Sequence, residues 1–515
     1  MRLAQKGYRV AVLESGKRWN PNDFPETNWN FRKYFWIPFF RCFGIQQITL
    51  LKGVMVLHGT GVGGGSLVYA NTLMKPPSGI FYSPQWPAGC NWEKELDPHF
   101  EVARKMLGVT ANTALMEGEQ ALQKIGERMG VASTFHPTEV GVYFGEPGKT
   151  VSDPYFSGTG PKRTGCILCG ACMIGCRHGA KNTLDFNYLY FAEKWGTTIF
   201  PETRALKIIW REDGYIVETE VSTSWFRKKG PDYIAKKVIL AAGVLGSVEI
   251  LLKNRDRFKT LPEISPRLGD WVRTNGESLL GATSFEAHRD LSRGIAIGAS
   301  IQADPKTRIE SVRYPSGSGA MRLLGVPLTD QGSKITRPVK MLKNVFRRFP
   351  QFFKLWRVKD WARSSLILLV MQSVDREMRF RLGRSVLNGF RSKLKGAATW
   401  EPIPSYLPVA QNACKILAEE IKGEPQNIIS EVMLGTPATA HILGGCSMGD
   451  SPKEGVIDSN HEVFKYPGLY VCDGSVIPVN LSVNPSLTIT AMAERFCVQF
   501  PALRQDRKIT FTTKS

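Results

Sequence analysis

The chain has 515 residues, of which 43% are hydrophobic and 22% are charged. This length exceeds one hydrophobic core and predicts two closely joined domains, and the composition is that of a globular protein. The net charge of +21 and the pI near 9.5 favour an anionic partner, either nucleic acid or an acidic lipid surface. No helix-turn-helix, zinc-finger or RNA-binding signature accompanies this charge, so we expect no nucleic-acid partner. Lipid is favoured over the alternative of a basic enzyme with neither partner.

The sequence also bears on where the protein works. No run of eighteen apolar residues occurs, so we expect no membrane-spanning helix, and the longest candidate, Leu366 to Met371, has the length of a strand. The N-terminus has neither the apolar region nor the small-residue cleavage site of a signal peptide. Four of the ten cysteines are crowded between 166 and 176, which suits a reducing compartment better than a disulfide framework. We expect a cytoplasmic protein, with peripheral attachment to a membrane as an open option.

The chain begins with the pattern of a helix end followed by a strand. Arg2 to Gly7 resembles a last helical turn with a glycine stop, and Tyr8 to Leu13 a buried parallel strand that ends at Glu14. In dinucleotide-binding units such an acidic residue binds the ribose hydroxyls, roughly 20 residues after a GxGxxG turn. Counting back from Glu14 passes Met1, so we expect the first strand and its phosphate loop to be missing, as in a truncated gene model. The alternative for Glu14 is a solvated carboxylate.

Two flanking segments are less specific. Residues 17–50 are rich in aromatic and basic side chains, and we expect them either to cover the mouth of an active site or to pack over the core. Residues 92–129 have a helical pattern and are assigned to a second domain.

The stretch from Leu57 to Asn71, LHGTGVGGGSLVYAN, carries five glycines within seven positions: Gly59, Gly61, Gly63, Gly64 and Gly65. A backbone without side chains can lie against a flat ring or a phosphate at contact distance. The alternative is a flexible surface loop, but the strand-like residues before the run and the apolar residues after it argue against a loop. We therefore expect this stretch to bind a cofactor.

Four cysteines, Cys166, Cys169, Cys172 and Cys176, have the C-x2-C-x2-C-x3-C spacing of a ferredoxin-type iron-sulfur run. This spacing predicts a metal site, and a [4Fe-4S] cluster is the favoured occupant. Zinc and reduced structural thiols remain the alternatives. Arg177 stands where a proline usually follows the fourth cysteine, so that cysteine would have to close the same cluster or give way to a remote one.

The middle of the chain contains two further patterns. Residues 237–252, KVILAAGVLGSVEILL, predict a buried strand, a glycine turn and a helix. Residues 334–363 carry ten Lys and Arg against one acid, Asp360, with aromatic residues at helical spacings of three and four. This is the pattern of a helix lying in an anionic membrane interface. A helix packed on its own domain is the alternative, although it would not need the excess of positive charge.

The C-terminal part gathers the reactive side chains. His441 precedes a double-glycine turn, Asp473 and Gly474 follow a strand, and Asn484 precedes a proline that opens the last helix. Pro485 suits the first turn of that helix, whose amides would point toward an anion or a carbonyl group. Alone, His441 would be read as a hydrogen-bonded core residue.

These segments together resemble the glucose-methanol-choline (GMC) flavoprotein oxidoreductases, and the GVGGGSLV core is most similar to their cholesterol oxidase branch. The resemblance runs from Arg2 to Arg495 through the glycine stretch, KVILAAG, HxxGG, the DGS turn and NPxxTITAxAER. The resemblance is weak between about residues 285 and 430. It implies an α/β fold with a Rossmann-like FAD-binding domain, lacking its first strand and GxGxxG, and a discontinuous α+β substrate domain.

The resemblance also implies site residues. His441 and Asn484 match the pair that faces the reactive edge of the flavin, where the imidazole takes the hydroxyl proton and the amide orients the oxygen. FAD is expected to contact the glycine-rich loop, Glu14 and the C-terminal motifs. The residues expected to bind it are Glu14, Gly59, Gly61, Gly63, Gly64, Gly65, Ser66, Asn71, Gly243, Asp473, Gly474, Asn484 and Pro485.

A third catalytic candidate is Glu310. The segment from Ile309 to Gly317 can be laid over the AEIAPMPAG-like segment of cholesterol oxidases, aligning a glutamate, a proline and a glycine. There the glutamate moves a steroid ring proton during double-bond isomerisation, a role that suits a buried carboxylate with a raised pKa. The alternative is a surface glutamate.

The predicted domain order follows from these assignments. Residues 1–91, 184–280 and 431–515 form the FAD-binding domain, 92–160 and 281–430 the substrate-binding part, and 161–183 a cysteine-containing insert.

The predicted function is FAD-dependent oxidation of a hydrophobic alcohol, with a 3β-hydroxysterol such as cholesterol favoured and Δ5 to Δ4 isomerisation as an addition. The electron acceptor is oxygen or a redox protein. One alternative is a GMC dehydrogenase for another hydrophobic alcohol that passes electrons through an Fe-S cluster. The other is a non-catalytic, membrane-associated remnant, because without the phosphate loop we expect the chain to hold FAD poorly.

Overall fold

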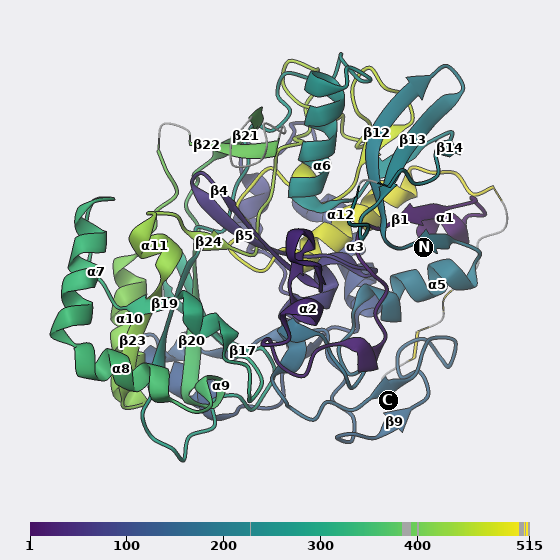
Figure 1. Cartoon of the computed structure of the whole chain (residues 1–515). Helices are drawn as coiled ribbons and strands as arrows, with labels where there is room; N and C mark the ends of the chain where they lie inside the picture. Colours follow the sequence, from purple (N-terminus) through teal and green to yellow (C-terminus); the bar gives the residue numbers. More distant parts are fainter. Residues whose placement is uncertain (227, 384–392, 399–400, 504–508, 510, 513–515) are drawn as a thin grey trace.

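A computed structural model describes the chain except for residues 227, 384–392, 399–400, 504–508, 510 and 513–515. The α-helices are α1 Arg2–Gln5, α2 Phe31–Tyr34, α3 Trp92–Leu107, α4 Glu117–Arg128, α5 Tyr188–Lys194, α6 Gly243–Leu252, α7 Thr336–Arg347, α8 Phe349–Arg357, α9 Trp361–Ser364, α10 Pro408–Glu420, α11 Ile429–Met433 and α12 Ser486–Val498. Figure 1 shows their arrangement.

The strands fall into parallel pairs, hairpins and one large antiparallel sheet. Their bounds are β1 Ala11–Leu13, β2 Trp36–Ile37, β3 Cys42–Phe43, β4 Gln46–Leu51, β5 Val54–Gly59, β6 Thr110–Ala111, β7 His136–Pro137, β8 Glu139–Val140, β9 Thr150–Val151, β10 Arg163–Thr164, β11 Thr198–Phe200, β12 Thr203–Arg211, β13 Gly214–Val221, β14 Tyr233–Ala235, β15 Val238–Leu240, β16 Ser278–Ser284, β17 Ile297–Asp304, β18 Thr307–Val312, β19 Gly325–Pro327, β20 Ser365–Gln372, β21 Met378–Gly383, β22 Lys393–Ala398, β23 Gly423–Ile428, β24 Ala438–Thr439 and β25 Leu469–Val471.

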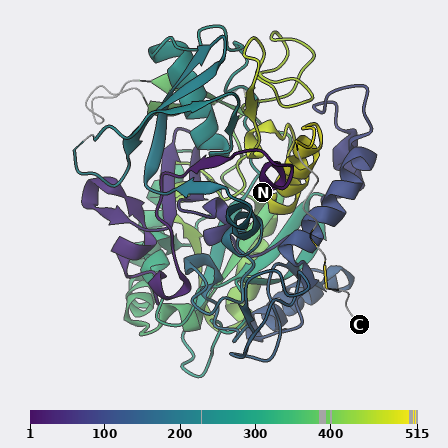
Figure 2. The ribbon, with the colours of Figure 1, turned by 90° about the vertical axis from the view of Figure 1, so that its right-hand side faces the viewer.

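The parallel part brings together segments from both ends of the chain. Strand β1 pairs in parallel with β11, and β15 pairs in parallel with β25. Helix α1 lies beside α12, as Figure 2 shows, where Arg2 Nε donates to Glu494 Oε2 at 2.7 Å. Because β15 leads into α6 after Ala241 and Ala242, the predicted strand, turn and helix over 237–252 are confirmed.

The N-terminal strand differs from its prediction. The sequence predicts a buried strand from Tyr8 to Leu13, whereas β1 covers only Ala11–Leu13 and Ala11 is exposed. The reason is that β1 has a strand neighbour on one side only within the described residues, so its other edge is open to a large cavity. The helix end at Gln5 and the glycine turn after it are as predicted, since Gly7 has a φ of +91°.

The antiparallel sheet forms the second half of the molecule. Its strand order is β19-β23-β16-β20-β18-β17-β7. Side chains alternate across each strand, so Leu368 and Val370 of β20 pack in the core with α4 and α10, whereas Ile367 and Leu369 turn to the other face. That other face borders the cavity.

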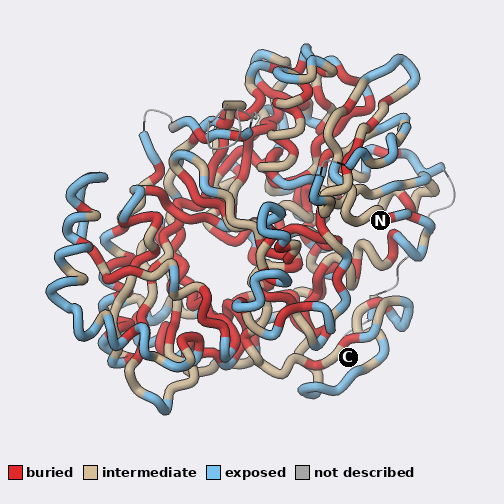
Figure 3. Tube along the Cα trace, viewed as in Figure 1, coloured by how far each residue is buried: buried red, intermediate tan, exposed pale blue. Residues whose placement is uncertain are grey.

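Several sequence predictions are met by these elements. The helical pattern over 92–129 corresponds to α3 and α4, the strand-length run at 366–371 to β20, and the basic segment 334–363 to α7, α8 and α9. Figure 3 shows α7 and α8 largely exposed at the periphery. The domain boundaries stay a prediction, and residues 384–392 and 399–400 of the predicted range 281–430 lie outside the described residues.

Residues 17–50 combine both roles expected of them. Trp19, Phe24, Tyr34 and Ile45 form a small core with residues of other segments. In contrast, Ile37 and Phe39 are exposed and line the cavity. In the described part of the chain, none of the helices combines the length and the apolar character needed to cross a bilayer.

Candidate active site

A cavity of about 3470 Å³ lies between the parallel strands and the antiparallel sheet. Pockets for a drug-sized ligand measure roughly 300–1,000 Å³, so this cavity has room for a dinucleotide and a substrate together. It is bordered by Glu14, the glycine-rich loop, and His441, Asn484 and Glu277.

Four polar side chains from distant parts of the sequence meet beside this cavity, and three of them border it. His441 Nδ1 lies 2.7 Å from Glu277 Oε1, and His441 Nε2 lies 3.4 Å from Asn484 Nδ2. Asn484 Nδ2 also donates to Glu310 Oε2 at 3.2 Å. All four residues are buried. We call them the polar cluster.

Rigid elements hold the polar cluster. His441 follows β24, which pairs in parallel with β5, the strand that enters the glycine-rich loop. Glu310 lies on β18 between β17 and β20, and Glu277 directly precedes β16. Asn484 stands two residues before α12. Strand pairing therefore fixes the distances between the loop, the imidazole and the two carboxylates.

The two carboxylates set the protonation of the site. Burial alone would lower the pKa of the His441 imidazole, but Glu277 and then Glu310 outweigh burial and leave that pKa raised. Burial raises the pKa of the Glu310 carboxyl, and Arg308, His441 and Asn484 offset this only in part. Both groups are therefore stronger proton acceptors than their free counterparts.

Three oxygen atoms of the polar cluster have no hydrogen-bond partner among the described residues: Glu277 Oε2, Glu310 Oε1 and Asn484 Oδ1. Buried polar atoms are rarely left unpaired, so such atoms call for a partner outside the chain. All three accept hydrogen bonds, and two of them belong to residues that border the cavity, Glu277 and Asn484. The cluster is therefore suited to a ligand that donates one, such as a hydroxyl group.

The glycine-rich loop turns bare backbone toward the cavity. Gly64 and Gly65 border it, and a Cβ atom added at either position would meet nothing within 4 Å. Gly61 serves the loop itself, because its φ is +136° and a Cβ there would lie 2.7 Å from Leu67 Cδ1. Glycine is required at Gly61 for packing, whereas at Gly64 and Gly65 it leaves room for a ligand.

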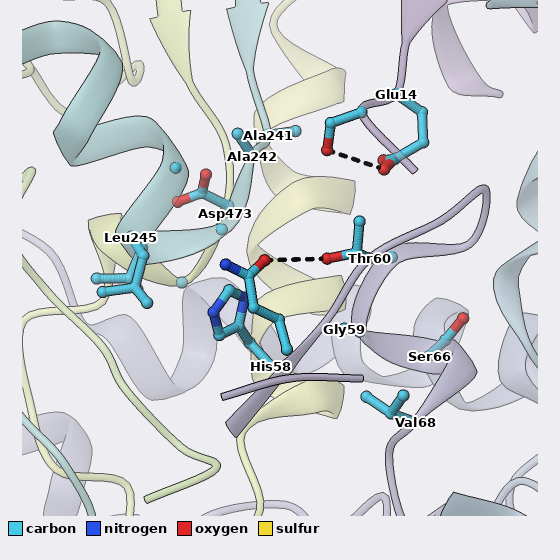
Figure 4. A pocket seen from close by; sticks show the side chains of 18 of the residues that line it. Glu14, His58, Gly59, Thr60, Ser66, Val68, Ala241, Ala242, Leu245 and Asp473 are labelled. Carbon is cyan, nitrogen blue, oxygen red and sulfur yellow. Dashed lines mark hydrogen bonds between the residues drawn. The ribbon is translucent and has the colours of Figure 1, made fainter. Parts of the chain in front are cut away.

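The carboxyl ends of the parallel strands converge opposite this loop. Glu14 follows β1, Ala241 and Ala242 follow β15, and Asp473 follows β25. Figure 4 shows Ala241 and Ala242 between the side chains of Glu14 and Asp473, with Gly59 and Thr60 across the pocket. In open α/β sheets, ligands bind outside the carboxyl ends of parallel strands. These strand ends and the bare loop fit a flavin dinucleotide.

Comparisons with known proteins agree with this geometry. A family model described as GMC oxidoreductase matches residues 161–254 and a second, also GMC oxidoreductase, matches 383–493. The chain is 42% identical over 513 residues to a cholesterol oxidase of Mycobacterium tuberculosis, covering 97% of this chain and 88% of that protein. The chain belongs to the GMC oxidoreductase family. It is an FAD-dependent alcohol oxidoreductase, and the predicted family, fold class and enzyme class are confirmed.

More distant GMC relatives extend the comparison. A long-chain-alcohol oxidase of Arabidopsis thaliana is 23% identical over 539 residues, which cover 96% of this chain and 64% of that protein. The crystal structure of pyridoxine 4-oxidase from Mesorbium loti matches with a TM-score of 0.63 at 15% identity, covering 97% of this chain and 96% of that chain. At this identity the structural match supports the fold alone.

Most residues predicted to bind FAD in this GMC oxidoreductase border the cavity: Glu14, Gly59, Gly63, Gly64, Gly65, Ser66, Gly243, Asp473, Gly474, Asn484 and Pro485. Some of them are also bonded within the protein. Glu14 Oε1 accepts from the amides of Gly16 at 2.6 Å and Gly61 at 3.1 Å, and Asp473 Oδ2 accepts from Ser247 Oγ at 2.5 Å. These bonds orient the carboxylates.

Three predicted residues lie elsewhere. Gly61 does not border the cavity but donates to Glu14. Asn71 is buried, has a φ of +70° and lies beside the Cys172 thiol. Glu310 is reached from the cavity through Asn484 and does not line it. Of the alternatives for Glu310, the surface glutamate is wrong, since its side chain is fully buried.

The metal centre predicted for the cysteine segment finds no support among the described residues. Cys166, Cys169, Cys172 and Cys176 line a small cavity of about 20 Å³, yet no three His, Cys, Asp or Glu side chains of the described residues are placed to hold a metal ion. Cys166 and Cys172 instead pack with Val140, Val142 and Ile295. Burial, and then the neighbouring Cys172, raises the pKa of Cys166 to about 12 and that of Cys169 to about 11, so both are protonated thiols in the metal-free chain.

The sequence gives no signal for three other residues of the site. Glu277 contacts His441 although 164 positions separate them. Lys181 is buried and donates to Leu67 O at 3.0 Å and Cys172 O at 2.8 Å, which ties the cysteine segment to the glycine-rich loop. His58 also borders the cavity, and burial lowers its pKa to about 4, so it is neutral at physiological pH. Only its position next to Gly59 could have suggested it.

Proposed function

We propose that this enzyme oxidises the 3β-hydroxyl of a sterol such as cholesterol to the ketone and then moves the Δ5 double bond to Δ4. The observation that carries the proposal is the apolar wall beside the polar cluster. Leu279, Ile297, Val312, Ile367 and Leu369 line the cavity from the face of the antiparallel sheet. A rigid, apolar substrate with one hydroxyl group fits this wall, with the hydroxyl at the cluster.

His441 and Asn484 act on the hydroxyl in this proposal. The substrate hydroxyl donates its hydrogen bond to His441 Nε2, which accepts the proton as the C–O bond becomes a carbonyl, and the Asn484 amide orients the hydroxyl oxygen. Glu277 at Nδ1 orients the imidazole and stabilises its protonated form. When bound, FAD accepts the hydride that leaves the alcohol carbon.

Residues that would hold FAD surround the cavity. Glu14 is suited to the ribose hydroxyls, the backbone at Gly64 and Gly65 to the isoalloxazine ring, and Asp473 with Gly474 to the ribityl chain or pyrophosphate. The N-terminus of α12 directs its first amides to the same region.

Isomerisation needs a second base. The Glu310 carboxylate would take a proton from ring carbon C4 and return it to C6, so that no net proton or electron is gained. Its burial and raised pKa support this role. Because Glu310 lies behind Asn484, the geometry supports oxidation more directly than isomerisation.

A substrate screen tests the choice of alcohol. Purified protein is incubated in air with cholesterol, with long-chain primary alcohols and with aromatic alcohols, and products are identified by mass spectrometry. We expect cholesterol to have the highest kcat/KM. A preference for long-chain alcohols would replace the sterol with the second candidate, which the similarity to the plant long-chain-alcohol oxidase favours. Absence of flavin absorbance after gel filtration would support the non-catalytic alternative.

We favour dioxygen as the acceptor because the cholesterol oxidase of M. tuberculosis is named an oxidase. The alternative route through an iron-sulfur cluster needs at least three converging thiolates, and the described residues contain no such group. Turnover under argon with an artificial acceptor, together with iron and sulfide in the purified protein, would instead favour the dehydrogenase.

Glu277→Gln is expected to move the acid limb of the kcat/KM profile to lower pH. The Glu277 carboxylate raises the His441 pKa, so its removal lowers that pKa. Activity needs the neutral imidazole and is lost as the pH falls through the His441 pKa. In Glu277→Gln this loss of activity therefore occurs at a lower pH than in the wild type. Steady-state rates across the pH range measure the shift.

Glu431→Gln provides the matched control for this prediction. Glu431 is also buried, and burial raises its pKa to about 8, so at neutral pH the amide replaces a mostly uncharged group. Its acid limb should stay where it is in the wild type. If the acid limb of Glu277→Gln does not move either, Glu277 does not set the protonation of His441.

A further inference from the structure

Helices α7 and α8 expose an unusual apolar face. Seven apolar side chains contribute to it; within each helix they recur at spacings of three and four, which places them along one side of that helix, and the first of them directly precedes α7. Each is between 43% and 78% exposed. They are Ile335, Val339, Leu342, Phe346, Phe349, Phe353 and Trp356, and we call them the α7–α8 face.

The opposite side of these helices already holds them on the protein. Met341 of α7 packs with Val326 and Val432, and Leu355 of α8 is buried. An amphipathic helix of a globular protein normally turns its apolar side inward. Here Met341 and Leu355 already provide the inward apolar contact. The α7–α8 face is a second apolar side, and no described residue covers it.

The same segment is strongly basic. Residues 334–363 contain ten Lys and Arg and a single acid, Asp360. Asp360 is engaged, because its carboxylate accepts from Ser316 Oγ at 2.5 Å and from the Gly317 amide at 3.0 Å. Seven exposed cations of the segment form no ion pair with a described residue: Lys334, Lys340, Lys343, Arg347, Lys354, Arg357 and Lys359.

The α7–α8 face continues toward the cavity. The Arg322 guanidinium lies over the rings of Trp356, at 5.6 Å, and of Trp29, at 5.8 Å, so it joins α8 to the segment 17–50. Next to Arg322, Met321 and Leu324 line the cavity, and so do the exposed Ile37 and Phe39 of the segment 17–50. The cavity therefore reaches the surface beside the exposed aromatic residues.

We propose that the α7–α8 face docks on an anionic lipid bilayer and places this opening of the cavity against the membrane. Aromatic and aliphatic side chains enter the interface, while the unpaired cations meet anionic headgroups. A second copy of the chain fits less well, because a twofold contact would set the two basic segments against each other. If the substrate is the sterol of the proposed function, it passes from the bilayer into the cavity without crossing water.

Vesicle flotation tests the docking surface. Wild-type protein is mixed with phosphatidylcholine vesicles that contain or lack phosphatidylglycerol. We expect binding to rise at least about tenfold with the anionic lipid and to fall in high salt, given the size of lysine and arginine contributions at such surfaces. No flotation of the wild type with anionic vesicles would overturn the proposal.

Three variants locate the surface. F346E/F353E should abolish flotation and K343E/R347E should reduce it at least about tenfold. Ile234→Glu is the matched control, since Ile234 is 83% exposed on β14, far from α7 in Figure 1, and should float like the wild type. Circular dichroism checks that each variant folds. A folded F346E/F353E that floats normally, or that only loses a dimer seen in gel filtration, contradicts lipid docking.

A second readout separates this inference from the proposed function. Each variant is assayed with sterol in detergent micelles and in anionic vesicles. F346E/F353E should match the wild type in micelles and lose at least about tenfold in vesicles. If the wild type floats but oxidises no sterol in either form, the proposed substrate is wrong and the docking surface stands. If sterol is oxidised in micelles but the wild type does not float, the docking surface is wrong and the proposed substrate stands.

Discussion

Replacing His441 with alanine lowers the rate of FAD reduction by sterol about 100-fold or more, and Asn484→Ala has a similar effect. His441 Nε2 and Asn484 Nδ2 lie 3.4 Å apart at the cavity, and Glu277 holds the other ring nitrogen of His441. Without the imidazole, no neighbouring group takes the hydroxyl proton in the same place. Without the Asn484 amide, the substrate hydroxyl is not held against the His441 imidazole.

The measurement is the rate at which flavin absorbance is lost after anaerobic mixing with substrate. The bound FAD per protein, measured in the same samples, should be close to wild type, which separates chemistry from cofactor loss. His288→Ala is the control, because the His288 side chain is 76% exposed and lies beside Glu286 rather than a member of the polar cluster. Wild-type reduction rates in both site variants would remove these two residues from the mechanism.

Replacing Glu310 with glutamine should leave alcohol oxidation within a few-fold of wild type and slow isomerisation about 100-fold or more. Glutamine keeps the size of the side chain and the contact with Asn484, but it cannot accept a proton. The raised pKa of Glu310 makes the wild-type carboxylate a strong base in a site closed to water. The two reactions therefore separate at this one residue.

Supplying the Δ5 ketone directly isolates the second reaction, since no hydride is transferred from it. The conjugated Δ4 ketone absorbs in the near ultraviolet and is followed in real time. Glu431→Gln again serves as a control, because it removes a buried carboxyl that is not in contact with His441 or Asn484. Isomerisation at the wild-type rate in Glu310→Gln would assign this step to another group.

Local patterns allowed much of the cofactor side to be predicted. Short stretches of sequence were enough to predict the run of glycines around Gly64, the strand and helix over 237–252 and the strand end at Asp473. The structure places all three around one cavity. The pairing of His441 with Asn484 followed from the order of motifs in the family. Their contact at 3.4 Å confirms the proximity and leaves the catalytic roles as a proposal.

Features that depend on tertiary contacts could not be predicted. Glu277 stands in the sequence TNGES directly before β16, and the fold brings it to His441 by placing β16 beside β24. The cysteine spacing suggested a metal centre, but Cys166 and Cys172 pack against apolar neighbours such as Val142 and Ile295, which other segments contribute. Likewise, the sequence of β1 predicts burial, whereas its exposure depends on which strand lies beside it.

The most direct test of the account is a single anaerobic turnover with cholesterol. FAD-loaded protein is mixed with cholesterol under argon, and flavin absorbance and sterol products are followed together. We predict that the absorbance is lost and that one ketone forms per flavin, with both rates reduced alike by His441→Ala. Flavin that stays oxidised in the presence of cholesterol, yet loses its absorbance with another alcohol, would contradict it.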